Sequence, residues 1–431
     1  MHTLIHREKN YRNLSKVRMN RVELKNNVTS LNISILLFAI SIFIPAFQFY
    51  VPKVIRYMFL FVSVILLGFQ VLKDYKLTND IIMILFECFI FSALVILSRG
   101  ITNNFFQWII WFFEFWYSLV ISIVVVRTKA YSGSILYYTL LFLLIFTTVT
   151  TIIGNQQYPY ASRKLASGIV EDGAFLLSKN IGGYGFIYGL VLMVPCILRR
   201  SKDITNLFHK ILCYAIVGLF LFCVFIAQYM LAILLIIAGI VFHLFSCIKR
   251  KSNKLMFATI LMIIFLLFIL FSEVIAQGLL NLSKKLSEYD SISDRIYSLY
   301  ELFSGNGFSE SSDANSRMDL YVRSIKTMFS YPLIGTFLFN NETLLGGHSD
   351  ILDSIAGTGI LGIIMILAIY RKWKGMIVKR SIVNRFYVVA VVFVILALTN
   401  TIFSSFQISF IMFLMPILSM RDTRTNEDCR N

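Results

Sequence analysis

The stretch that decides the fold runs from Ile211 to Cys247 and reads ILCYAIVGLFLFCVFIAQYMLAILLIIAGIVFHLFSC. It contains no Asp, Glu, Lys or Arg, and Gln228 marks the only clear break in it. A helix of about 20 apolar residues crosses the hydrocarbon core of a bilayer, which is about 30 Å thick. The stretch is therefore long enough for two membrane-spanning helices that reverse direction at Gln228.

Similar apolar runs fill most of the chain. Of the 431 residues, 58% are hydrophobic, and the mean hydropathy is +0.75. In a water-soluble protein about half of the residues are apolar. A soluble fold would leave part of this larger apolar share exposed to water. The sequence predicts an all-α integral membrane protein with about twelve transmembrane helices. The predicted spans lie near 31–50, 54–72, 80–97, 105–126, 134–153, 182–198, 209–226, 229–247, 255–279, 350–370, 386–404 and 406–420.

The basic residues predict the orientation of these spans. If the N-terminus is cytoplasmic, most of the 40 Lys and Arg residues fall in cytoplasmic segments, as the positive-inside rule requires. The net charge of +17 then reflects membrane topology, and no nucleic-acid partner is expected. The predicted divisions are a cytoplasmic tail at 1–30, helices at 31–279 with an outer loop at 154–181, a large extracytoplasmic loop at 280–349, helices at 350–420 and a cytoplasmic tail at 421–431. The first thirty residues are polar and basic, so we expect no removable signal peptide.

The large outer loop contains an amphipathic segment at 315–329. Apolar side chains recur there at helical spacing, Asn315 or Ser316 is suited to the N-cap, and Tyr331-Pro332 follows as a stop. We expect this helix to lie at or near the membrane surface.

His348 lies where this loop meets the next predicted span. A histidine of near-neutral pKa is suited to take a proton from an acceptor hydroxyl. The alternative is an interfacial histidine that only packs or caps. Asp350 and Asp353 follow at the spacing of a capping box, which favours a capping role for both.

Four basic residues in the outer loops are candidates for binding an anionic substrate: Arg163, Lys164, Arg317 and Arg323. The planar fork of arginine binds two oxygens of a diphosphate at once. Solvated charge, or contact with lipid headgroups, is the competing interpretation.

Two acidic residues, Glu87 and Glu114, fall within predicted spans. A carboxylate at that depth faces a cavity or a partner, so a proton pathway in a transporter and a structural hydrogen bond are both open. No metal site and no cofactor are expected, because the sequence has neither a paired CxxC motif nor an outer Asp-x-Asp triplet. Gly185-x-x-x-Gly189 has the small-xxx-small form that allows close helix packing.

The region around His348 resembles a known family. His348-Ser349 is followed after nine residues by Gly359-Ile360-Leu361-Gly362, a spacing similar to the signature of O-antigen ligases and Wzy-type polymerases. The segments 315–321 and 331–335 resemble the Arg-bearing stretch upstream of that signature, and Asn180-Ile181-Gly182 is similar to a further family pattern. The strong resemblance covers 315–362, and the rest of the chain agrees in layout.

The resemblance implies a metal-independent glycosyltransferase in the bacterial inner membrane. Its substrate would be an oligosaccharide linked to undecaprenyl diphosphate, with His348 activating the acceptor hydroxyl and Arg317 holding the leaving diphosphate. The family also implies membrane lipid, a flippase and a chain-length regulator as partners.

Three functions remain open at this point. The ligase Thr-x-Ser-Arg segment is absent at 227–230, where Ala-Gln-Tyr-Met stands, and this favours a polymerase of lipid-linked repeat units, as in O-antigen or capsule synthesis. An Arg-x10-Gly motif described for some polymerases is also missing, since Arg163 reaches Gly173 one residue early. An O-antigen-type ligase is the near alternative. A transporter or lipid-linked oligosaccharide flippase is the alternative from another class, although the sequence shows no related halves.

Overall fold

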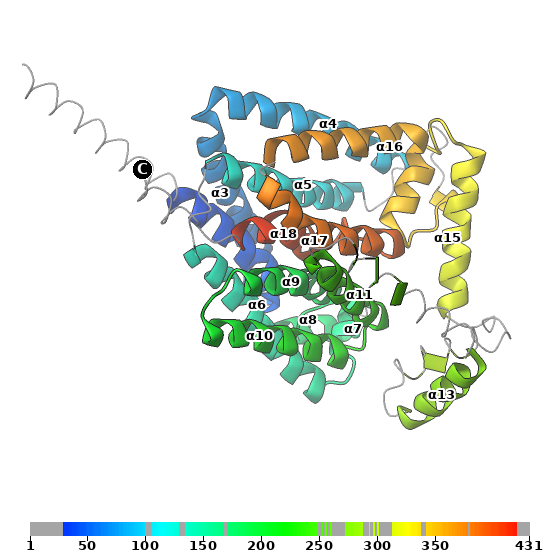
Figure 1. Ribbon diagram of the computed structural model, residues 1–431. Coiled ribbons are helices and arrows are strands. Elements are labelled where there is room, and N and C mark those ends of the chain that lie inside the picture. The colour runs from blue at the N-terminus through cyan, green and yellow to red at the C-terminus, as the bar shows by residue number, and fades with distance from the viewer. Residues whose placement is uncertain are drawn as a thin grey trace, which may run out of the picture.

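The structure is a computed structural model that describes residues 29–99, 105–128, 134–167, 170–248, 272–287, 313–337, 342–377 and 380–419, with a few short pieces between 252 and 300. All regular secondary structure in these residues is helical. The long helices run roughly side by side in one bundle (Figure 1). They are Thr29–Phe43, α3 (Lys53–Leu72), α4 (Tyr75–Arg99), α5 (Phe105–Arg127), α6 (Ser134–Gln157), α9 (Tyr184–Lys202), α10 (Leu207–Ile226), α11 (Met230–Cys247), α16 (Asp350–Ile377), α17 (Arg380–Thr399) and α18 (Phe406–Leu418).

Seven of the described helices are long and apolar enough to cross a membrane: α3, α4, α5, α6, α10, α11 and α16. Three shorter helices are also apolar, namely Thr29–Phe43, the part of α17 from Phe386 to Thr399, and α18. The chain is thus a polytopic, all-helical membrane protein, as predicted. The count of twelve spans stays a prediction, and most of the predicted span at 255–279 lies outside the described residues.

The predicted breaks between the spans at 209–226 and 229–247 and between those at 386–404 and 406–420 are confirmed. Between α10 and α11, Gln228 adopts a positive φ of 58° and its side chain is buried. Between α17 and α18, the chain leaves the helix after Thr399 and resumes at Phe406, so Ser404 and Ser405 lie in the connection.

The predicted span at 31–50 is wrong as a single helix. The observed helix ends at Phe43, and Ile44 adopts an extended conformation (φ −109°, ψ 96°). A second helix, α2 (Pro45–Tyr50), then begins with the proline. Proline has no N–H and disfavours the helical region for the residue before it, which breaks the helix here. Side chains satisfy the freed backbone groups: Thr147 donates to the carbonyl of Phe43 (2.7 Å), and Asn180 accepts from the N–H of Ala46 (3.1 Å). Asn180 therefore has a structural role in this bundle.

The central helix is α9, which packs against α10, α11, α17 and α18. A Cβ at Gly185 would lie 2.5 Å from Oε1 of Gln407, and one at Gly189 would lie 2.9 Å from Cδ1 of Ile411. Both partners belong to α18, so the prediction that these glycines allow close helix packing is confirmed.

Polar contacts define the two ends of the bundle. At one end, Arg200 of α9 donates to the carbonyl of Ser419 (3.0 Å) and lies over the ring of Tyr137 (4.0 Å). At the other end, Arg99 closes α4 beside Asp350, the first residue of α16. We call these the Arg200 end and the Arg99 end; the predicted orientation puts the Arg99 end outside.

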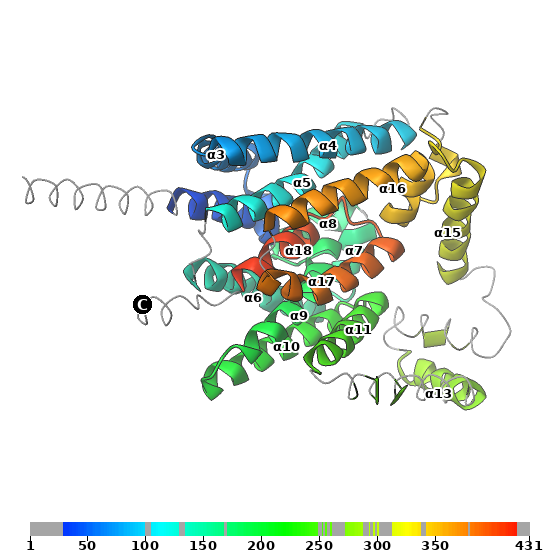
Figure 2. The same ribbon diagram turned by 45° about the horizontal axis from the view of Figure 1, so that its top comes forward.

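The helix α15 (Asp313–Ser330) lies across the Arg99 end, roughly perpendicular to α4 and α16 (Figures 1 and 2). The predicted helix at 315–329 is thereby confirmed. The prediction of Asn315 or Ser316 as its N-cap is wrong, because the helix takes in Asp313 and Ala314. Three short helices and one 3-10 turn complete the described elements: α7 (Ala161–Ser167), α8 (Val170–Ser178), α13 (Ser272–Lys285) and η1 (Glu342–Leu344).

Candidate functional site

The candidate site forms where α16 begins. The hydroxyl of Ser349 accepts from the N–H of Leu352 (3.1 Å), so Ser349 is the N-cap of the helix. The same hydroxyl donates to the carbonyl of Ala397 in α17 (3.2 Å). The predicted capping role of Asp350 and Asp353 is wrong, since both carboxylates bind other parts of the chain.

Asp350 holds the connection between α17 and α18. Its Oδ2 atom accepts from the backbone N–H groups of Ile402 (2.5 Å) and Phe403 (2.7 Å). The residue is 1% exposed, so these donors replace the water that a carboxylate would otherwise require.

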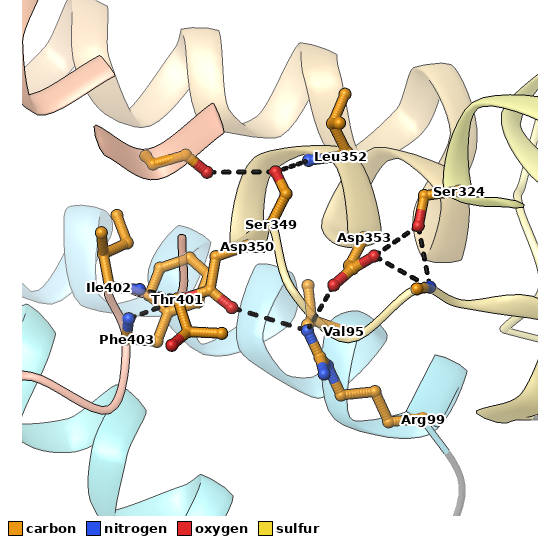
Figure 3. Close-up of polar contacts among 12 residues, drawn as sticks. Val95, Arg99, Ser324, Ser349, Asp350, Leu352, Asp353, Thr401, Ile402 and Phe403 are labelled. Atoms are coloured by element: carbon orange, nitrogen blue, oxygen red, sulfur yellow. Dashed lines mark hydrogen bonds and ion pairs between the residues drawn. The ribbon is translucent and has the colours of Figure 1, made fainter. Parts of the chain in front are cut away.

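Asp353, one turn further along, binds α15 and the segment before α16. Its Oδ1 atom accepts from the hydroxyl of Ser324 (2.5 Å) and from the N–H of Gly346 (3.2 Å). The N–H of Gly346 also donates to the Ser324 hydroxyl (2.8 Å). This three-membered group fixes α15 against the start of α16 (Figure 3).

Arg99 lies between the two carboxylates (Figure 3). Its Nη2 atom is 3.6 Å from Oδ1 of Asp350 and 3.9 Å from Oδ2 of Asp353, and its guanidinium stands 4.2 Å from the ring of Trp108. The side chain is only 10% exposed. A buried cation between two buried carboxylates offsets part of their desolvation cost, and the aromatic face adds to this.

Sequence reasoning missed Arg99. The available signal was its position, since it ends an apolar run at the predicted outer end of a span. That position would have suggested a partner near the membrane surface. It would not have identified Asp350 and Asp353.

The glycine signature has a direct structural role. Gly359 interrupts α16 with φ 62° and ψ −152°. The N–H of Ile360 beyond the break donates to the carbonyl of Pro332 (2.8 Å). A Cβ at Gly335, whose φ is +63°, would lie 2.4 Å from the carbonyl oxygen of Gly357. A Cβ at Gly359 would in turn lie 2.7 Å from the backbone nitrogen of Gly335. The two backbones approach this closely only because neither Gly335 nor Gly359 carries a side chain.

This contact joins two pieces of the predicted motif. The segment 331–335 satisfies backbone donors that the break in α16 exposes, and the segment 357–361 surrounds the break. Buried donors inside a membrane protein require such partners. Both segments resemble family motifs in the sequence, but the sequence does not predict the backbone contact between them.

His348 is exposed at the Arg99 end, immediately before the buried Ser349. The bonds of Ser349, Asp350 and Asp353 fix the backbone on its C-terminal side. Gly347, with a φ of +80°, sets the turn on the other side. The side chain of His348 is thus exposed at the surface, while hydrogen bonds hold the backbone that follows it in place.

The four predicted basic residues occupy two helices. Arg323 is exposed on α15. Arg317 belongs to the same helix, but its side chain lies outside the described residues. Arg163 is half-buried and Lys164 is exposed on α7.

A tyrosine cluster connects α7 to the loop that Asp350 holds. Tyr229 donates to the carbonyl of Ser162 in α7 (2.9 Å), and Tyr184 donates to the carbonyl of Thr401 (2.8 Å). The ring of Tyr188 is 5.8 Å from that of Tyr229 and 4.8 Å from that of Tyr184. The cluster therefore places α7, with Arg163 and Lys164, at the Arg99 end.

The two acidic residues within spans have different surroundings. Glu87 forms an ion pair with Lys372 of α16 on a partly exposed surface. Glu114 is buried, and among the described residues its Oε2 atom has no hydrogen-bond partner.

No protein-family model matches the chain, and no curated protein shows significant similarity to it.

Proposed function

We propose that the protein polymerises lipid-linked oligosaccharide repeat units at the Arg99 end. The growing glycan is transferred from one undecaprenyl diphosphate to the acceptor hydroxyl of another lipid-linked repeat. The observation that carries the proposal is the arrangement around α16: the 331–335 segment closes on the break at Gly359, and the exposed His348 stands on the anchored start of the same helix.

In the proposed reaction His348 takes the proton from the acceptor hydroxyl. The acceptor oxygen then forms a bond to the anomeric carbon of the growing chain, and the bond from that carbon to the diphosphate oxygen breaks. The electron pair leaves with undecaprenyl diphosphate, whose charge basic residues stabilise. Arg323 and Arg317 on α15, with Arg163 and Lys164 on α7, are the candidates for that contact.

The buried aspartates are positioning residues in this proposal. Asp350 and Asp353 lie within five residues of His348 and are fully buried, so they are not accessible to a glycan. Arg99 is also buried between them, which leaves the exposed cations for the diphosphate.

The direct test uses purified protein in lipid vesicles with a lipid-diphosphate-linked repeat unit, without nucleotide or metal. We expect a ladder of glycan products on a gel, and no ladder from folded His348→Ala. The matched control is His209→Ala, an exposed histidine at the start of α10 on the Arg200 side, which should leave the ladder unchanged. A ladder from His348→Ala equal to that of the parent protein would exclude His348 as the base.

Glu114 is the observation that best supports the competing hypothesis. It is a buried carboxylate whose Oε2 atom has no hydrogen-bond partner among the described residues, and such carboxylates occur in proton-coupled transporters. If the parent protein forms no ladder with its own substrate, and Glu114→Gln abolishes movement of a lipid-linked glycan across the vesicle membrane, the transporter or flippase replaces the polymerase. A ligase would instead transfer the glycan once, to a different acceptor, and give a single product.

A further inference from the structure

The helix α15 has three distinct faces. One face packs against the bundle through polar groups: Ser324 binds Asp353, Thr327 donates to the carbonyl of Leu344 (2.7 Å), and Tyr321 donates to the carbonyl of Thr399 (2.7 Å). Ser324 and Thr327 are buried. The amphipathic helix is thus mounted with polar side chains toward the protein, the reverse of a helix on a water-soluble core.

The second face is an exposed apolar row. Its members recur at intervals of three and four residues and share one side of the helix: Met318, Val322, Ile325 and Phe329. Phe329 is 74% exposed. Leu333, which is 70% exposed, extends the row beyond the end of the helix.

The apolar row continues onto the flank of α16. Pro332 contacts Ile360 through the backbone hydrogen bond at the helix break, and Ile360 and Ile364 are both exposed. These residues belong to a helix long and apolar enough to cross a membrane, whose exposed side faces lipid. The row on α15 is therefore connected, through Leu333 and Pro332, to an exposed apolar flank of α16.

The third face carries charge. Asp319, Arg323, Lys326 and Ser330 are exposed and lie roughly a quarter turn from the apolar row. Two cations beside an apolar row are the arrangement by which an interfacial helix contacts lipid phosphates while its apolar side enters the acyl region.

From these faces we infer that α15 is a membrane-surface anchor, whose row from Met318 to Leu333 is immersed in the lipid leaflet at the Arg99 end. α15 runs across the ends of the long helices (Figure 2), and a helix that lies parallel to a bilayer surface would have this direction. A second protein would not explain why the row merges with the lipid-facing flank of α16. Bilayer lipid is therefore the partner of this face.

The anchor has a consequence for the candidate site. Ser324 and Asp353 link α15 to the start of α16, so the depth of α15 in the leaflet sets the height of the segment that carries His348. The inference concerns lipid contact alone and does not depend on the proposed polymerase activity.

The experiment places a diazirine amino acid in the full-length chain in place of Val322 or Phe329. The matched control carries it in place of Ser330, which is exposed on the polar face of the same helix. Each protein is reconstituted in phosphatidylethanolamine and phosphatidylglycerol vesicles and irradiated, and mass spectrometry identifies the adducts. All three positions are exposed, so the replacements leave packing intact.

We expect phospholipid adducts at Val322 and Phe329, and mainly water adducts at Ser330. Mainly water adducts at Val322 and Phe329 would show that the row lies outside the leaflet and would overturn the inference. Crosslinks from these positions to a second copy of the chain would assign the row to a protein interface and would overturn it equally.

Discussion

Arg99 shows how a single cation organises the site. Two carboxylates that are each 1% exposed would be costly to ionise without compensation. Backbone N–H groups bind one oxygen of Asp350, and Ser324 with Gly346 binds one oxygen of Asp353. The remaining oxygens face Arg99. The cation thus completes a set of interactions that the other elements begin.

Arg99→Met should destabilise the protein by about 3–5 kcal/mol, because it leaves two buried carboxylates without a countercharge. The measurement is thermal unfolding in detergent. Arg323→Met, on an exposed arginine, is the control and should change stability by less than about 0.5 kcal/mol.

Adding Asp350→Asn and Asp353→Asn to Arg99→Met should recover part of the loss, since the uncompensated charges are then removed. If Arg99→Met unfolds at the same temperature as Arg323→Met, the buried pairing has no energetic role.

At the scale of elements, the site is assembled from helices that meet at their ends. At the start of α16, Asp353 accepts a hydrogen bond from Ser324 of α15. Asp350 accepts one from the backbone of Ile402 in the α17–α18 connection. Further along α16, the backbone at the Gly359 break binds the segment after α15, since the N–H of Ile360 donates to the carbonyl of Pro332. Two separate contacts therefore hold α15 and its C-terminal extension against α16, and only the first depends on a side-chain bond.

Ser324→Ala should loosen α15 while leaving the bundle intact. It removes a buried hydroxyl that both donates to Asp353 and accepts from Gly346, at a cost of about 1–3 kcal/mol. We expect faster hydrogen–deuterium exchange in 313–330 and unchanged exchange in α9. Ser330→Ala removes an exposed hydroxyl that donates to the carbonyl of Lys326 in the same helix, and this variant should match the parent protein. Equal exchange in the two variants would contradict the link between α15 and Asp353.

At the scale of the whole molecule, the contacts divide the helix termini between two ends. The start of α6 and the ends of α9 and α18 meet at Arg200, which contacts Tyr138 and Ser419. The end of α4 and the start of α16 meet at Arg99. This division fits the alternation expected of helices that cross a bilayer one after another. The positive-inside rule predicts that the Arg200 end is the cytoplasmic one.

The orientation can be measured by cysteine labelling in intact cells. A membrane-impermeant maleimide should label Asp319→Cys, which is exposed on α15 at the Arg99 end. It should label His209→Cys, exposed near the start of α10, only after the membrane is permeabilised. The parent protein gives the background from native cysteines. The reverse pattern would invert the predicted topology and place His348 in the cytoplasm.

The class of the molecule and the positions of most helices could be predicted from the sequence alone. Apolar runs and charge asymmetry act locally, so they can be read without knowing which segments touch. The reversal at Gln228 and the helix at 315–329 were predicted in this way, and His348 was selected from its position at the junction.

The contacts between these parts could not be predicted from the sequence, because they join segments that lie far apart in the chain. The pairing of Arg99 with Asp350 and Asp353 joins segments far apart in the chain, and no spacing rule connects them. The sequence predicted a capping role for these aspartates because it shows only local neighbours, whereas the buried carboxylates bind α15, α4 and the α17–α18 connection. Periodicity likewise defined the apolar face of α15, but it did not show that Ser324 and Thr327 on another face are buried in contacts with Asp353 and Leu344.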